Sequence, residues 1–83
     1  MSHATYDLDH IFKYHQPQEG DPARYEAIRE AGKHLAQAIL DNAPAGADQT
    51  TAIRKIREAV MTANAAIALR GRLLRGINQG VQD

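Results

Sequence analysis

The chain has 83 residues and a mass of 9.1 kDa, which limits it to one small domain with a thin core. Cysteine is absent, so disulfides, thiol nucleophiles and cysteine-based zinc sites are excluded. Fifteen residues are alanine, and large core-building side chains are scarce. Chains of this kind usually gain stability from disulfides, a metal or a partner chain. Because disulfides are excluded, we expect a homo-oligomer.

The formal net charge is zero, but the charges are unevenly placed. Residues 1–53 carry four basic and eight acidic side chains, whereas residues 54–83 carry six basic and two acidic ones. This asymmetry indicates head-to-tail self-association or an anionic ligand on the later segment, with a solvated basic helix face as the alternative. Overall neutrality argues against binding of duplex nucleic acid. With no long apolar run and no signal-peptide pattern, a cytoplasmic protein without membrane contact is expected.

Residues 1–20 are predicted to form an N-terminal arm with one or two helical turns. Its apolar side chains are Leu8, Ile11, Phe12 and Tyr14. Pro17 and Gly20 then break the helical pattern. An arm of this size cannot fold alone, so it must dock on another part of the assembly.

Residues 21–42 are predicted to form the first long helix. Asp21 is the expected N-cap, and Pro22 suits the first helical position. The predicted apolar face consists of Tyr25, Ile28, Leu35 and Ile39. Gly32 weakens the helix, which indicates close approach of a backbone or ligand there, unless the glycine is merely tolerated.

Residues 48–70 are predicted to form the second long helix, with Asp48 as its N-cap. Apolar residues follow the spacing of a narrow packing seam at Ile53, Ile56, Val60, Ala63 and Ile67. Two helices of similar length and a short loop predict an all-α antiparallel hairpin. Beside the seam lies a strip of small side chains, formed by Ala59, Ala63 and Ala66, which supports packing between protomers. Residues 71–83 form a basic tail that is expected to fray, with a short helix or a partner-binding segment as alternatives.

No pattern for catalysis or for a cofactor is recognisable. The only serine is Ser2, and His10 and His15 lack the spacing of paired helical metal ligands. Asp7 and Asp9 form a bare D-x-D, which we interpret as surface or capping chemistry. Phosphate-binding glycine loops are also absent from the sequence. We therefore expect a non-enzyme with no cofactor and no metal.

Side chains suited to binding a nucleotide are easier to find than catalytic ones. Tyr14 and His15 offer flat rings for stacking on a nucleobase. Positive charge for phosphates is available at Arg29, Lys33 and Arg70. Asn64 interrupts the seam between Val60 and Ile67, where it either contacts a ligand or fixes helix register, the latter being preferred.

Three segments together resemble a known family. They are Phe12-Lys13-Tyr14-His15-Gln16-Pro17, then the run RYEAIR at 24–29, and then EAVMTANAAIA at 58–68. Their order resembles the phage anti-CBASS sponges, which sequester the cyclic oligonucleotide messengers of bacterial immunity. A similar hairpin module occurs in anti-Thoeris sponges, which sequester signals of the cyclic ADP-ribose type.

This resemblance implies a homohexamer of hairpin protomers in the host cytoplasm. It also implies pockets between protomers for cyclic dinucleotides such as 3′,3′-cyclic GMP-AMP and, in some members, separate sites for cyclic trinucleotides. By motif order, Tyr14 matches the family's aromatic contact. Arg29 matches its dinucleotide-binding lysine. An arginine at this position keeps the positive charge but contacts a phosphate with a different geometry. Arg70 matches the cation of the trinucleotide site, although a helix-end role is the alternative.

Two other functions compete with a sponge. One is a small helical adaptor that binds another protein through the alanine-rich face. The other is a weak nucleic-acid-binding regulator that uses the basic tail. The preferred cyclic nucleotide and the number of site types do not follow from the sequence.

Overall fold

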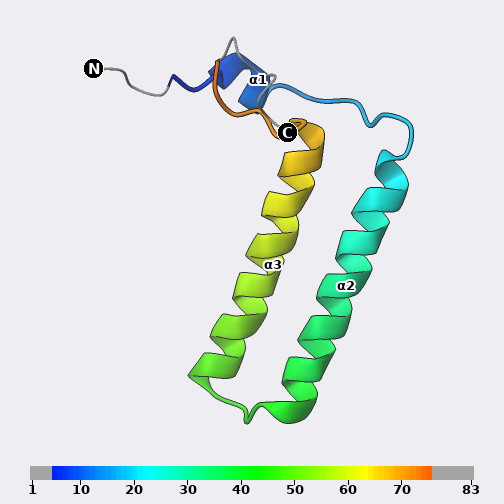
Figure 1. The fold of residues 1–83 in the computed structure, drawn as a ribbon. Helices are drawn as coiled ribbons and strands as arrows, with labels where there is room; N and C mark the ends of the chain where they lie inside the picture. The colour runs from blue at the N-terminus through cyan, green and yellow to red at the C-terminus, as the bar shows by residue number, and fades with distance from the viewer. Residues whose placement is uncertain (1–4, 76–83) are drawn as a thin grey trace.

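The chain folds as an antiparallel helical hairpin with a short helix across its open end (Figure 1). The computed structural model describes residues 5–75, and within them it contains α1 (Leu8–Phe12), α2 (Asp21–Asn42) and α3 (Ala47–Ala68). Each long helix has 22 residues, or about 33 Å at 1.5 Å per residue. An all-helical hairpin was expected, with its second helix at 48–70, two residues beyond the observed end of α3.

The start of α2 differs from the expected capping. Gly20 is the N-cap residue, in a left-handed conformation with φ of 89°, and Asp21 is already the first helical residue. The Asp21 side chain turns back toward the loop, where its Oδ2 accepts the backbone N–H of Gln18 at 2.8 Å. Asp21 is therefore not the N-cap, and its carboxylate serves other partners.

The start of α3 also differs. Gly46 is the N-cap residue, and no side chain caps this end. Asp48 lies inside the first turn, so the prediction that it is the N-cap is wrong. Its negative charge there still complements the positive end of the helix dipole.

The end of α3 forms a Schellman motif. The Gly71 N–H bonds to the carbonyl of Ala66 at 2.9 Å, and the Arg70 N–H bonds to that of Ile67 at 3.2 Å. Arg70 takes the left-handed position with φ of 55°, which usually belongs to glycine or asparagine. Because the backbone is left-handed at Arg70, α3 ends before this residue, earlier than the sequence pattern suggests.

The two long helices come close at Gly32. A Cβ added there would lie 2.7 Å from Cγ2 of Val60 and 3.6 Å from Cγ2 of Ile56. The expected close approach at Gly32 is thus made by side chains of α3. Leu35 was expected on the same face, but it is 53% exposed, and Ala36 is turned inward in its place.

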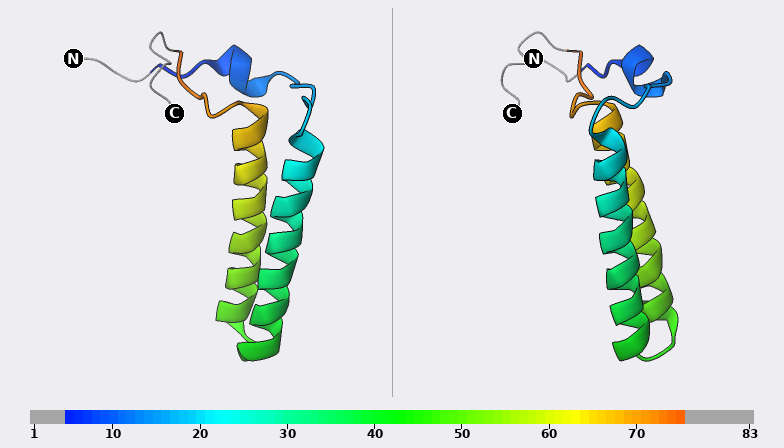
Figure 2. Two further views of the ribbon diagram at one scale, coloured as in Figure 1. Left: turned by 45° about the vertical axis from the view of Figure 1, so that its right-hand side comes forward. Right: turned by 90° about the vertical axis from the view of Figure 1, so that its right-hand side faces the viewer.

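The arm and the tail dock on each other at the open end of the hairpin, and α1 lies across the end of α3 (Figure 2). Residues Tyr6 and Leu74 form an isolated antiparallel bridge. Backbone bonds run from the Asp7 N–H to the Leu73 carbonyl and from the Arg75 N–H to the Thr5 carbonyl, at 3.0 and 2.7 Å. The expectation of fraying is therefore wrong for residues 71–75, and residues 76–83 lie outside the described part of the chain.

The hairpin buries little. Among residues 5–75, Leu69 and Asp21 are the only buried side chains. The seam residues of α3 are half-buried, whereas Ala59 and Ala66 of the small-residue strip are exposed. Large apolar side chains are exposed on every element, at Tyr6, Leu8, Phe12, Tyr14, Leu35, Leu40, Met61, Leu73 and Leu74. These exposed apolar side chains are available for contact with a partner chain.

Replacing Gly32 tests the close approach. We expect Gly32→Ala to lower the free energy of unfolding by about 1–3 kcal/mol, because a stiff valine must move and this outweighs the better helix propensity of alanine. Urea denaturation measures the change. Val60→Ala in the same chain should reduce the penalty of Gly32→Ala, whereas equal penalties with and without Val60 would contradict the contact.

Candidate functional site

A groove runs along the middle of the hairpin, between α2 and α3. Its cavity volume is about 350 Å³, near the lower end of the range of small-molecule sites. The lining comes from both helices and consists of Arg29, Gly32, Lys33, Ala36, Ile53, Ile56, Arg57, Val60 and Met61. Gly32 leaves the middle of the groove without a side chain on the α2 side. The groove thus has an apolar floor with three cations.

The three cations differ in their surroundings. The Arg29 guanidinium donates to Oε1 of Glu26 at 2.8 Å, in an exposed pair one turn apart on α2. Lys33 and Arg57 have no acidic partner within 4.0 Å among residues 5–75. Because none of the nine lining residues is acidic, the groove favours an anionic ligand.

An ion pair with a buried carboxylate joins the two helices at the open end of the hairpin. Nη1 and Nη2 of Arg70 donate to the two carboxylate oxygens of Asp21, at 3.1 and 2.5 Å. The Asp21 side chain is 1% exposed, and it also holds the loop through Gln18. A two-pronged bond of this kind fixes direction as well as distance. The pair joins the first residue of α2 to the residues that end α3.

The same contacts shift the charges of the pair. The Arg70 guanidinium and the Gln18 N–H hold the pKa of Asp21 below its ordinary value, because both favour the charged carboxylate. Asp21 in turn raises the pKa of Arg70 above its already high ordinary value. Both groups are therefore charged at neutral pH.

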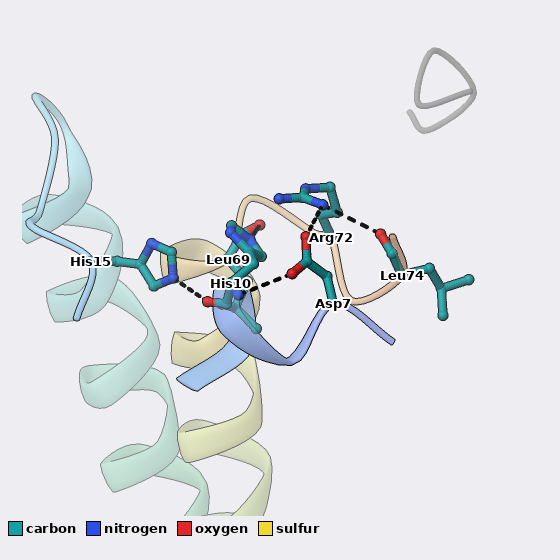
Figure 3. A network of polar contacts seen from close by, with 6 residues as sticks. All are labelled: Asp7, His10, His15, Leu69, Arg72 and Leu74. Carbon is teal, nitrogen blue, oxygen red and sulfur yellow. Dashed lines mark hydrogen bonds and ion pairs between the residues drawn. The ribbon is translucent and has the colours of Figure 1, made fainter. Parts of the chain in front are cut away.

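The arm is held by a second set of polar contacts (Figure 3). Asp7 caps α1 by accepting the His10 N–H at 3.1 Å, and its other oxygen accepts from Arg72 at 2.8 Å. These two donors lower the pKa of Asp7, with Arg72 the larger cause. The side chain of His10 bonds through Nε2 to the Leu69 carbonyl at 3.1 Å. The interpretation of Asp7 as a capping residue is confirmed.

His15 lies against this network. Its Nε2 bonds to the His10 carbonyl at 2.6 Å, and the two rings meet edge to face with centroids 4.6 Å apart. His15 is half-buried, so its ring faces the arm instead of an open surface. The neighbouring Tyr14 is 81% exposed, as is Phe12. Tyr14 is therefore available for stacking, whereas His15 already serves the arm.

Asn64 carries an unpaired oxygen. Its Oδ1 is buried and has no hydrogen-bond partner among residues 5–75. Asn64 is not among the groove-lining residues, although it lies one turn beyond Val60 on α3. A buried acceptor without a donor is costly, so an approaching donor would be stabilised there.

The structure brings together two of the six residues predicted to bind a ligand. Arg29 and Lys33 line the groove. The remaining four do not line it, namely Tyr14, His15, Asn64 and Arg70. The arm lies at the open end of the hairpin, and Arg29 lies eight residues into α2, about 12 Å along its axis.

Sequence reasoning missed Arg57 and Met61. Both lie beside seam positions of α3, and the helical period places them on the edge that faces Arg29 and Lys33. The signal in the sequence was Gly32, because residues next to the part of α3 that approaches this glycine lie on the same edge.

Other site types have no support in the described residues. No three histidine, aspartate or glutamate side chains within residues 5–75 gather closely enough to hold a metal ion. None of the helices in that part of the chain is long and apolar enough to cross a bilayer.

Residues 5–68 match the family described as Acb2/Tad1, hairpin domain. Because the match covers well over half of the chain, the protein belongs to this family of anti-CBASS and anti-Thoeris sponges. Membership implies a sponge-type function against bacterial defence, in a family known for binding and not for catalysis. No curated protein and no solved structure matches the chain.

Asp21→Asn tests the ion pair at the open end. The pKa of Asp21 is depressed in the folded state, so its contribution to stability is full above the unfolded pKa of about 3.9 and disappears as pH falls through the folded value. We expect the variant to unfold at lower urea than the wild type at neutral pH, with the difference shrinking below about pH 4.

Asp9→Asn is the matched control, because Asp9 is exposed and has no ion pair among the described residues. A difference between wild type and Asp21→Asn that stays constant from pH 7 to pH 3 would contradict the assigned role.

Proposed function

We propose that this member of the Acb2/Tad1 hairpin family is a sponge that sequesters cyclic dinucleotides, such as 3′,3′-cyclic GMP-AMP, without cleaving them. It would act in the cytoplasm of the infected bacterium and thereby inhibit CBASS-type defence. The observation that carries the proposal is the groove, because Arg29 and Lys33, two cations expected from the sequence to bind phosphate, line one apolar cavity.

The chemistry of a cyclic dinucleotide fits this groove. Such a ligand carries two phosphates and two bases, so it needs cations beside apolar or flat surfaces. Arg29 and Lys33 lie one turn apart on α2 and supply charge, while Ile53, Ile56 and Val60 supply an apolar wall. No nucleophile or metal is needed for a protein that only holds its ligand.

The aromatic contact is proposed to come from a second copy of the chain. Tyr14 is 81% exposed but does not line the groove of its own hairpin. An assembly that places the arm of one protomer over the groove of another would bring stacking and charge together. The homohexamer implied by the family would also cover the exposed apolar side chains of the hairpin.

Three further residues are proposed to act outside the groove. Arg70 is the candidate cation of a separate cyclic trinucleotide site, where a ligand would have to compete with Asp21 for its guanidinium. Asn64 is proposed to accept a hydrogen bond from a ligand or a neighbouring helix through its unpaired oxygen. His15 is proposed to support Tyr14 through its bond to the arm.

A small adaptor that binds another protein remains the alternative function. The observation that favours it is the exposed strip at Ala59 and Ala66, where another helix could approach closely. An adaptor would not take up a cyclic dinucleotide, so the ligand experiment separates the two functions.

The direct test is recovery of intact ligand. Protein is mixed with 3′,3′-cyclic GMP-AMP, separated from unbound ligand and then denatured by heat. A sponge returns the cyclic dinucleotide unchanged, and an enzyme returns a product. Absence of uptake would contradict the proposal and favour the adaptor.

Two substitutions test the proposed contacts. Tyr14→Ala removes a stacking contact worth about 1–3 kcal/mol per base. Arg29→Ala removes a charge-assisted bond worth about 1.5–3 kcal/mol. Each should weaken binding about ten-fold or more in calorimetry, because about 1.4 kcal/mol is one decade. Lys13→Ala is the control on the arm, because Lys13 has no ion pair among residues 5–75, and wild-type affinity in both test variants would refute the pocket.

Assembly is tested separately. We expect light scattering to give a mass well above that of a monomer, and removal of residues 1–17 to weaken assembly and ligand binding together. Within one chain, residues 5–10 are held by the chain's own α3 end and tail, so truncation also exposes that end. Circular dichroism therefore checks that the truncated chain is still helical. A stable, folded monomer that binds ligand as tightly as the full chain would overturn this part.

A further inference from the structure

Two cations that have no acidic partner among residues 5–75 lie on opposite sides of the groove. Lys33 belongs to α2 and Arg57 to α3, and both line the cavity. Gly32 precedes Lys33 and lies against Val60 and Ile56, the residue directly before Arg57. The missing side chain at Gly32 is what lets the helices approach closely at this level. Both residues therefore line one narrow, largely apolar space.

Their electrostatic surroundings set them apart from Arg29. The guanidinium of Arg29 donates to Glu26 at 2.8 Å, so part of its charge is already compensated. No carboxylate among residues 5–75 lies within 4.0 Å of the charged nitrogens of Lys33 or Arg57. Because two cations beside an apolar floor repel each other, an anion between them relieves the repulsion and gains attraction from both.

We propose that Lys33 and Arg57 form a clamp, one residue from each helix, that holds a phosphate group of the bound nucleotide. This inference rests on the proposed function and deepens it, because it assigns Arg57 to the site and adds the Lys33–Arg57 pair to the phosphate contact of Arg29. The apolar walls of the groove then take the sugar or base attached to that phosphate.

Three consequences distinguish the clamp from a general basic face. Arg57 contributes although it lies on α3, outside the motifs of the sequence. Its neighbours Arg54 and Lys55 do not contribute, because they do not line the groove. The planar guanidinium of Arg57 can donate two parallel bonds to one phosphate, which lysine cannot, so Arg57→Lys recovers only part of the affinity.

The experiment compares matched variants of the full chain by calorimetry with 3′,3′-cyclic GMP-AMP. We expect Lys33→Ala and Arg57→Ala each to weaken binding ten-fold or more. Arg54→Ala removes the same charge from the same helix and should stay within about two-fold of wild type, since losses from net charge alone are small in screening salt. Raising the salt concentration should weaken wild type more steeply than Arg57→Ala.

A second probe separates this inference from the proposed function. Inorganic pyrophosphate is titrated into isotope-labelled protein while the Gly32 amide resonance is followed. A shift at Gly32 that disappears in Arg57→Ala supports the clamp even where the cyclic dinucleotide is not bound, in which case only the proposed function fails. Circular dichroism confirms folding, and Arg57→Gln replaces Arg57→Ala where alanine unfolds the chain.

The clamp is overturned by either of two results. The first is wild-type affinity for both probes in Lys33→Ala and Arg57→Ala. The second is an equal loss in Arg54→Ala, which would show that only the overall charge of α3 matters.

Discussion

The ion pair between Asp21 and Arg70 is the interaction on which the rest of the hairpin depends. It lies at the open end, where the first residue of α2 meets the turn that ends α3. It also holds the loop through Gln18 and accompanies the left-handed backbone of Arg70. Since the Asp21 carboxylate is 1% exposed and accepts from Arg70 at both oxygens, the pair fixes how the end of α3 meets the start of α2.

That alignment creates the groove and also leaves it incomplete. With the ends fixed by Asp21 and Arg70, Gly32 faces Val60, and cations from both helices line one apolar cavity. The exposed aromatic side chains of the arm lie at the open end, away from the cavity lining. A single chain thus presents the charged and the stacking parts of the proposed nucleotide site at separate places. In a family of sponges, this division is consistent with a site shared between copies of one small chain.

Local patterns in the sequence predicted the hairpin well, because breakers and helical spacing depend on neighbouring residues only. Gly32 was found in the same way, whereas Arg29 and Lys33 were named for their charge and Arg29 also for its place in a family motif. Leu35 was misplaced because its position on the helix is near the border of the apolar face, where the small Ala36 fits the narrow gap better. The partner of Asp21 and the place of Arg57 in the groove depend on contacts between distant segments, and the pattern within one segment does not determine such contacts. For the same reason, the docking of residues 71–75 on the arm could not be read from the tail.

A complete ligand site is proposed to need two chains. Complementation between two variants in mixed assemblies tests this requirement most directly. Tyr14→Ala and Lys33→Ala chains are each titrated alone with 3′,3′-cyclic GMP-AMP, and then unfolded together, refolded as a mixture and titrated again. If the stacking ring and the cation come from different copies, the mixture regains a fraction of tight sites that neither variant has alone. A mixture that binds no better than its two components would contradict the account.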